Sequence, residues 1–153
     1  MEKQSIEDLL RRDGKYLVTT VGTSMKPMLR DRCDSALLIP AEGRLSRFDV
    51  PLYRRVSGEL VLHRVLKVHE SGYTVCGDNQ LRMEHIRHDQ VIGVLRGFYR
   101  KHGYVDVHAR TYRAYVFFWC RLFWLRKICL RCKGFAAGAR RALCRKNRSS
   151  QGH

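Results

Sequence analysis

This sequence of 153 residues has no apolar run long enough to cross a membrane, and its C-terminal third is almost free of acidic residues. An apolar and aromatic stretch spans 12 positions, Ala114–Leu125, and is broken by Arg121. A transmembrane helix needs about 20 such residues, so this stretch is too short to be one. Residues 101–153 carry 13 Lys and Arg against one acidic residue, Asp106. Most of the net charge of +16 therefore lies in this third, where it predicts an anionic partner.

Groups of metal-ligating residues are also scarce. Of the six cysteines, Cys129 and Cys132 form the single Cys-x-x-Cys pair, without a second pair or a His partner at zinc-finger spacing. We therefore predict no metal ion and no cofactor. Residues 1–15 are too charged for the apolar core of a secretory signal peptide. This predicts a cytoplasmic chain whose thiols stay reduced.

The first hundred residues have the pattern of a β domain preceded by a short helix. Ser5 and Asp8 are typical of a helix start, and Gly14 is typical of its end. No repeat of 20–50 residues and no alternation of strands with helices is visible. We therefore expect a mainly β catalytic domain, a curled antiparallel sheet, over residues 1–109.

The strands of this domain are expected where short runs of β-branched, aromatic and apolar residues occur. Ser71-Gly72 is typical of a hairpin between two of these runs, and Pro51 favours a strand start or a sheet edge. The expected strands are Tyr16–Val21, Ala36–Ile39, Val50–Val56, Leu60–His69, Tyr73–Cys76, Val91–Tyr99 and a last pair, Lys101–Gly103 with Tyr104–His108.

The C-terminal third replaces this strand pattern with aromatic and basic residues. Trp119 and Trp124 stand among apolar residues with arginines between and after them, which is typical of an amphipathic helix at a membrane interface. We expect this helix over residues 110–139 and a disordered basic tail over residues 140–153. Three roles stay open for Tyr112–Leu130: contact with an anionic membrane surface, which the pattern favours, packing on its own domain, or, least favoured, non-specific nucleic-acid binding. In the first case the cytoplasmic chain would be peripheral at the membrane through this helix.

Two turns and one strand carry candidate catalytic side chains. Ser24 lies in a stiff turn between Gly22 and Pro27 that presents one hydroxyl at its bend. His63 stands in a run that is apolar on both faces, and partial burial favours the neutral imidazole that a general base needs. Asp78 follows the next strand in a Gly-Asp-Asn turn, where hairpin pairing would bring it near His63. Taken singly, each has a structural alternative: an ordinary turn, a buried structural histidine and an Asx turn.

Taken in this order, the three motifs resemble the type I signal peptidase family and its relatives, the self-cleaving repressors. The resemblance rests on Gly22-Thr-Ser-Met-Lys-Pro-Met-Leu29, Leu62-His-Arg-Val65 and Gly77-Asp-Asn79. Bacterial members typically have Lys-Arg-Val where this chain has His-Arg-Val. The histidine form is similar to the endoplasmic-reticulum and archaeal branch, and the similarity covers residues 16–100.

This resemblance implies a site, a fold and an activity. Ser24 matches the nucleophile, His63 the general base and Asp78 the acid that supports the histidine. The backbone N–H of Ser24 would contribute to the oxyanion hole. The family fold is an all-β domain of curled antiparallel sheets, and family members cut exported precursors after small residues. The residues expected to shape the site or contact substrate are Gly22, Met25, Pro27, Gly77 and Asn79.

The chain departs from the family at its N-terminus. Signal peptidases usually have N-terminal membrane segments and the repressors an N-terminal DNA-binding domain, and the first 15–20 residues here contain neither. Lys26 and Lys67 are weaker candidates for the base, because Lys26 is expected to be too exposed and Lys67 lies too far along the strand from His63. We expect a serine endopeptidase that cleaves a signal, leader or precursor peptide. The alternative is a non-catalytic peptide-binding or membrane-surface-binding protein of the same fold, and the oligomeric state stays open.

Overall fold

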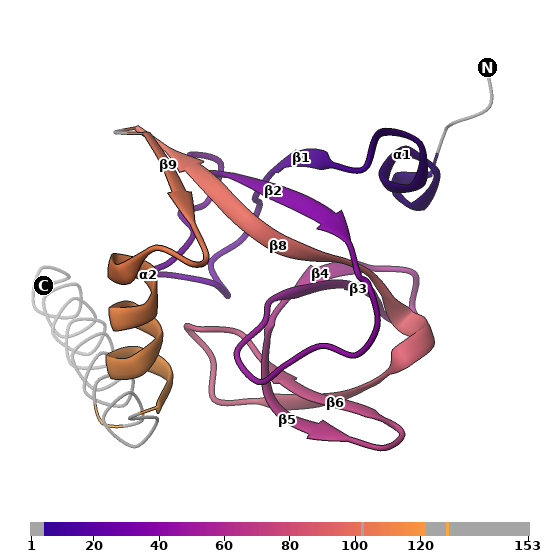
Figure 1. The fold of residues 1–153 in the computed structure, drawn as a ribbon. Coiled ribbons are helices and arrows are strands. Elements are labelled where there is room, and N and C mark those ends of the chain that lie inside the picture. The colour runs from indigo at the N-terminus through magenta and orange to yellow at the C-terminus, as the bar shows by residue number, and fades with distance from the viewer. Residues whose placement is uncertain (1–4, 102, 122–127, 129–153) are drawn as a thin grey trace, which may run out of the picture.

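The computed structural model describes residues 5–101, 103–121 and 128, and within them the protein is mainly β. A short helix, α1 (Ile6–Asp13), precedes a curled antiparallel half-barrel, and a C-terminal helix follows it (Figure 1). The expected fold class is confirmed. The larger sheet contains β1 (Tyr16–Thr19), β2 (Ser35–Pro40), β3 (Pro51–Arg54), β4 (Leu60–Leu62), β8 (Val91–Arg100) and β9 (Gly103–Asp106); the smaller contains β5 (Arg64–His69), β6 (Gly72–Cys76) and β7 (Met83–Arg87).

Helix α1 begins and ends at the cap residues that the sequence predicts. The Ser5 hydroxyl accepts a hydrogen bond from the backbone N–H of Asp8 at 3.2 Å, which satisfies a free donor of the first turn. Gly14 ends the helix in the left-handed conformation, with φ 65°, which glycine adopts without a Cβ clash. Leu10 is buried and joins the core with residues of β2 and β8.

The larger sheet has the strand order β1-β2-β8-β3-β4, with β9 paired to β8, and all its pairs are antiparallel. Strands β1 and β4 therefore form the two ends of this path. Pro51 is the first residue of β3, where its missing N–H is tolerated. The register of β8 shifts against both β2 and β3, and such bulges bend a strand and increase its twist. These shifts account for the curl.

The predicted strand Leu60–His69 is two strands in the structure. β4 ends at Leu62 and pairs with β3 in the larger sheet, whereas β5 begins at Arg64 and pairs with β6 in the smaller sheet. His63 thus lies where the chain passes from one sheet to the other. The hairpin expected at Ser71-Gly72 joins β5 to β6 and is confirmed. Strand β7, which the sequence pattern does not predict, pairs with β6.

Two apolar cores fill the half-barrel. The first lies among α1, β2, β8 and the turn after β1, and the second lies between β3, β4 and the smaller sheet. Burying one such side chain stabilises the fold by about 1.5–3 kcal/mol, so residues of the turn after β1 anchor it firmly. The buried members are Leu10, Met25, Met28, Leu29, Ala36, Leu38, Val50, Leu52, Leu95, Phe98 and Tyr112 in the first core, and Leu45, Tyr53, Val61, Val65, Tyr73, Val75 and Ile86 in the second.

After β9 the chain forms α2 (Arg110–Tyr115) and continues as a π-helical segment, Val116–Arg121. Tyr112 is buried in the first core, and Tyr115 packs against this core. The start of the C-terminal helix therefore packs on the β domain, which is one of the three roles considered from the sequence. No helix among the described residues is long and apolar enough to span a membrane.

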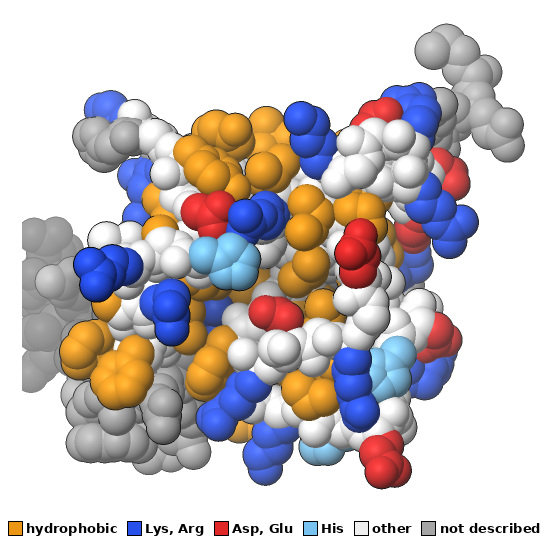
Figure 2. Space-filling model, viewed as in Figure 1, with side chains coloured by type: hydrophobic (Ala, Val, Ile, Leu, Met, Phe, Trp, Pro, Cys, Tyr) orange, Lys and Arg blue, Asp and Glu red, His pale blue; other side chains and the backbone are white. Residues whose placement is uncertain are grey.

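The other side of this helix faces solvent. Phe117 is 49% exposed and Phe118 is 66% exposed. In Figure 2 hydrophobic side chains gather at this end of the molecule with Lys and Arg side chains nearby. The rest of the helix predicted up to residue 139, the Cys129-x-x-Cys132 pair and the tail predicted at 140–153 lie outside the described residues.

Candidate active site

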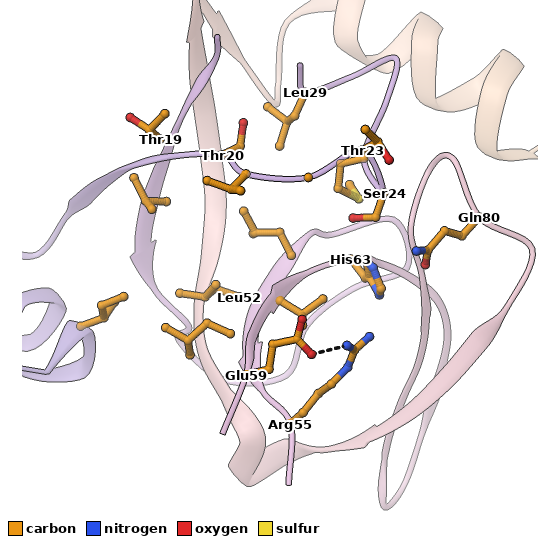
Figure 3. Close-up of a pocket in the computed structure, with 18 residues that line it drawn as sticks. Thr19, Thr20, Thr23, Ser24, Leu29, Leu52, Arg55, Glu59, His63 and Gln80 are labelled. Carbon is orange, nitrogen blue, oxygen red and sulfur yellow. Dashed lines mark hydrogen bonds and ion pairs between the residues drawn. The ribbon is translucent and has the colours of Figure 1, made fainter. Parts of the chain in front are cut away.

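A pocket of about 470 Å³ opens between β1, β4 and the turn that follows β1 (Figure 3). Ser24 lines it from this turn, and His63 lines it from the link between β4 and β5. Most of the other walls are apolar, and an ion pair between Arg55 and Glu59 lies at one side (Figure 3). A concave, largely apolar site with a few polar groups is typical of a ligand pocket. The apolar lining includes Ile6, Val18, Leu29, Leu52, Val61 and Leu62.

The turn that carries Ser24 is held in place by backbone and core contacts. Gly22 has φ 100°, which favours glycine, and its N–H donates to the Asp31 carboxylate at 2.7 Å. Met25 is buried in the first core, so the residue after Ser24 anchors the turn. Pro27 follows a cis peptide bond and is exposed. Ser24 itself is half-buried at the pocket, where a substrate could reach its hydroxyl.

The Gly-Asp-Asn turn after β6 lies directly against the Ser24 turn. Asn79 donates its backbone N–H to the Ser24 carbonyl oxygen at 2.7 Å and its side-chain amide to the Thr23 carbonyl oxygen at 3.1 Å. A Cβ on Gly77 would stand 2.6 Å from the Ser24 carbonyl oxygen and 3.1 Å from Nε2 of His63. Only a glycine fits this point without a displacement. The structure thus brings Ser24, His63, Gly77 and Asn79 together (Figure 3 labels the first two).

The imidazole of His63 is held by a residue that the motifs do not include. His63 is 1% exposed, and its Nδ1 lies 3.0 Å from the hydroxyl oxygen of Tyr53. That hydroxyl donates its proton to Oε2 of Glu84 at 3.1 Å. Because a tyrosine hydroxyl has one proton, Nδ1 must then be the donor to the Tyr53 oxygen. This assigns the proton of neutral His63 to Nδ1 and leaves the lone pair on Nε2, on the side of Gly77 and Ser24.

The Glu84 carboxylate stays ionised because it is paired with the positive charge of Arg55. Burial alone would raise the pKa of Glu84, but hydrogen bonds from Arg55 and Tyr53 outweigh it and lower the pKa overall. Arg55 donates Nε to Oε2 at 2.9 Å and also contacts Oε1 through Nη2. Burial raises the pKa of Tyr53, so its hydroxyl keeps the proton that it donates to Glu84. The acceptor for the Tyr53 proton is therefore a carboxylate.

The environment also favours neutral His63. Its pKa is lowered from 6.5, chiefly because burial disfavours the imidazolium, although the Glu84 carboxylate raises it in part. A neutral imidazole with a free Nε2 lone pair can accept a proton near neutral pH. Lys26 and Lys67, the weaker candidates, are both exposed. His63 is the candidate base that the geometry favours.

The Asp78 carboxylate binds Arg64 and not His63, the partner expected from the sequence. It accepts from Nε of Arg64 at 2.8 Å and from Nη2 at 2.7 Å, a bidentate pair in which both side chains are fully buried. The Tyr115 hydroxyl donates to the same carboxylate at 2.8 Å. Arg64 is the first residue of β5 and is paired with Cys76, two residues before Asp78, so its guanidinium lies within reach of the Asp78 carboxylate. The orienting contact on Nδ1 of His63 comes from Tyr53 instead.

Tyr53, Arg55 and Glu84 are the functional candidates that sequence reasoning missed. Tyr53 lies on β3 and Glu84 on β7, 31 residues apart, so no local motif joins them. The alternation of Glu84 with buried Ile86 indicates a carboxylate on the inner face of a strand, which is the one signal that could have singled it out.

Among the described residues, no group of three or more His, Cys, Asp or Glu side chains could hold a metal ion. No protein-family model matches the chain, and neither the comparison with curated proteins nor that with solved structures found a match. What the residues themselves define is a mainly β fold with a serine and a buried histidine at one pocket.

Proposed function

We propose that this protein is a serine endopeptidase of the signal-peptidase type, which cleaves a signal, leader or precursor peptide. Ser24 is the nucleophile and His63 the general base. The observation that carries the proposal is the approach of the Ser24 turn and Nε2 of His63 to one point at Gly77. The order of the three motifs, which resembles the signal peptidase family, supports the same assignment.

The reaction uses the proton positions that the hydrogen bonds favour. The Ser24 hydroxyl attacks a peptide carbonyl, and its proton passes to Nε2 of His63. The imidazolium is stabilised through Nδ1–H and the Tyr53 hydroxyl by the Glu84 carboxylate. His63 returns the proton to the leaving amine, and the acyl-enzyme is hydrolysed by a water that His63 activates in turn. The backbone N–H of Ser24 is the candidate oxyanion donor.

The pocket supports a peptide as the substrate. Strands β1 and β4, the two ends of the larger sheet's path, both contribute to its walls. The unpaired side of such a strand can bind an extended peptide through backbone hydrogen bonds. The apolar lining favours apolar side chains on that peptide.

The test is incubation of the purified protein with leader-like and precursor peptides, followed by mass spectrometry of the products. Ser24→Ala and His63→Ala should each abolish cleavage while circular dichroism and thermal unfolding stay close to wild type. Ser71→Ala and His85→Ala, which alter an exposed serine and an exposed histidine, are the matched controls and should cleave normally. Wild-type turnover in both Ser24→Ala and His63→Ala would overturn the proposal.

A second candidate is a non-catalytic peptide-binding module of the same fold. The observation that favours it is the location of the pocket beside β1 and β4, because strand addition there does not require the Ser24 hydroxyl. This candidate predicts peptide binding by wild type and Ser24→Ala alike, with no Ser24-dependent product.

We also propose that the protein is cytoplasmic and contacts an anionic membrane surface peripherally through Tyr112–Leu130. Exposed Phe117 and Phe118, next to exposed Arg113, support this contact. Sedimentation with vesicles of neutral lipid, and of neutral lipid mixed with anionic lipid, tests it. The protein should pellet with the anionic vesicles, and Phe117→Ser/Phe118→Ser should reduce pelleting. Absence of lipid-dependent pelleting would contradict the proposal.

A further inference from the structure

One face of the C-terminal helix meets the buried ion pair between Arg64 and Asp78. Tyr112, Tyr115 and Trp119 are spaced by three and four residues, so they share this face. The Tyr112 hydroxyl accepts from Nη1 of Arg64 at 2.9 Å. The guanidinium carbon of Arg64 lies 5.7 Å from the centre of the Tyr112 ring and 5.9 Å from that of Tyr115. Three aromatic side chains of one helix therefore enclose one ion pair.

Two of these aromatics bind Asp78 directly. The Tyr115 hydroxyl donates to the carboxylate at 2.8 Å, and the indole N–H of Trp119 donates to the backbone carbonyl of Asp78 at 3.0 Å. The two rings are stacked, with centroids 6.5 Å apart and an angle of 17° between their planes. The side chain and the backbone of Asp78 are thus both held from the helix.

Asn79, the residue after Asp78, connects Asp78 to the turn that carries Ser24. Asn79 donates its backbone N–H to the Ser24 carbonyl oxygen at 2.7 Å and its side-chain amide to Thr23 at 3.1 Å. Arg64 provides a second connection, because its Nη2 donates to the sulfur of buried Met28 in the same turn at 2.9 Å. The aromatic face of the helix and Ser24 are therefore linked by two short series of direct contacts.

We propose that Tyr115 and Trp119 are positioning residues for Ser24, and that the C-terminal helix must be docked on the Asp78 turn for full peptidase activity. The proposal rests on the proposed function. Neither residue lines the pocket, so neither contacts the substrate there. Loss of either hydrogen bond would let the Asp78–Asn79 turn move, and a small displacement of a nucleophile lowers its reaction rate without weakening substrate binding.

The test compares Tyr115→Phe and Trp119→Phe with wild type, Ser24→Ala and the control Phe118→Leu. Both positioning variants keep an aromatic ring and remove one donor. Phe118 is 66% exposed, so its variant alters the same segment away from Asp78. Each protein is titrated with a serine-reactive phosphonate, which counts competent sites, and kcat per site and KM are measured with the same leader-like peptide. Thermal unfolding is recorded for all.

Loss of one hydrogen bond should lower kcat per site about fivefold in each variant and leave KM within about twofold. Phe118→Leu should leave both constants unchanged. An unchanged kcat per site in Tyr115→Phe and Trp119→Phe, with Ser24→Ala inactive, overturns this inference and leaves the proposed function intact, even if the melting temperature falls. Activity in Ser24→Ala overturns the proposed function itself.

Discussion

Tyr53→Phe is the substitution that separates an oriented catalytic histidine from a merely buried one. It removes the hydroxyl that lies between Nδ1 of His63 and Oε2 of Glu84 and leaves the ring in the second core. Without this hydroxyl, Oε1 of Glu84 lies 3.8 Å from Nδ1 of His63, too far for a hydrogen bond, so the proton is no longer held on Nδ1. The fraction of molecules with a free lone pair on Nε2 should therefore fall.

The size of the effect follows from burial. Tyr53 is 0% exposed and His63 is 1% exposed, so bulk water cannot supply a new acceptor. A buried donor left without a partner costs about 1–3 kcal/mol, and each 1.4 kcal/mol corresponds to about tenfold in rate. We expect kcat/KM on its pH plateau to fall by about 5- to 140-fold.

The assay is the pH dependence of kcat/KM with a fluorogenic leader-like peptide. The matched control is Tyr73→Phe, which removes another buried tyrosine hydroxyl from the same core, one that accepts from the Leu45 N–H at 2.9 Å. This control should lose stability and keep wild-type kcat/KM. Nitrogen NMR of labelled histidine, assigned with His63→Ala, should show Nε2 unprotonated in wild type. A folded Tyr53→Phe protein with an unchanged plateau would refute the role assigned to this hydroxyl.

Three further predictions follow from other contacts. Because burial lowers the pKa of His63, wild-type kcat/KM should reach half its plateau below pH 6.5, and a kinetic midpoint above pH 7 would contradict the assignment. The contribution of His63 to the free energy of unfolding should be present above pH 6.5 and be lost as the pH falls through the pKa of the folded state. Gly77→Ala should lower kcat/KM by about tenfold or more, because its methyl would stand 2.6 Å from the carbonyl oxygen of Ser24 and displace the turn that carries it. Wild-type kinetics would contradict this geometry. Arg64→Met leaves the Asp78 carboxylate buried without its cation and should lower the free energy of unfolding in urea by about 3–5 kcal/mol, whereas Arg87→Met, at an exposed ion pair, should leave it unchanged.

The fold could be predicted where its signals are local. The caps Ser5 and Gly14 and the hairpin at Ser71-Gly72 each involve residues a few positions apart, and each is found where expected. The break at His63 could not be predicted, because the run Leu60–His69 contains no glycine or proline to mark it. The break depends on the neighbouring strands, because β4 pairs with β3 in the larger sheet and β5 pairs with β6 in the smaller one. Strand β7 was hidden because Met83–Arg87 contains a single β-branched residue.

The candidate site could likewise be predicted only in part. Ser24, His63, Gly77 and Asn79 could be named from motifs, and the structure brings these four together. The partner of His63 could not be named, because hairpin pairing and the order of the motifs both favoured Asp78 over Tyr53. The neighbouring Arg64 contained a warning against this choice, since its guanidinium offers a carboxylate a bidentate partner.

The two carboxylates at the site contribute differently because of the cations beside them. Asp78 is neutralised by Arg64 and holds a turn; Glu84 is neutralised by Arg55 and holds a tyrosine. A carboxylate placed directly on Nδ1, without a cation beside it, would raise the pKa of His63 and so disfavour the neutral imidazole. A tyrosine hydroxyl placed between them fixes the ring and its proton without adding a charge. The Tyr53–Glu84 pair therefore orients the imidazole while burial keeps it neutral, and that combination is what a general base for Ser24 requires.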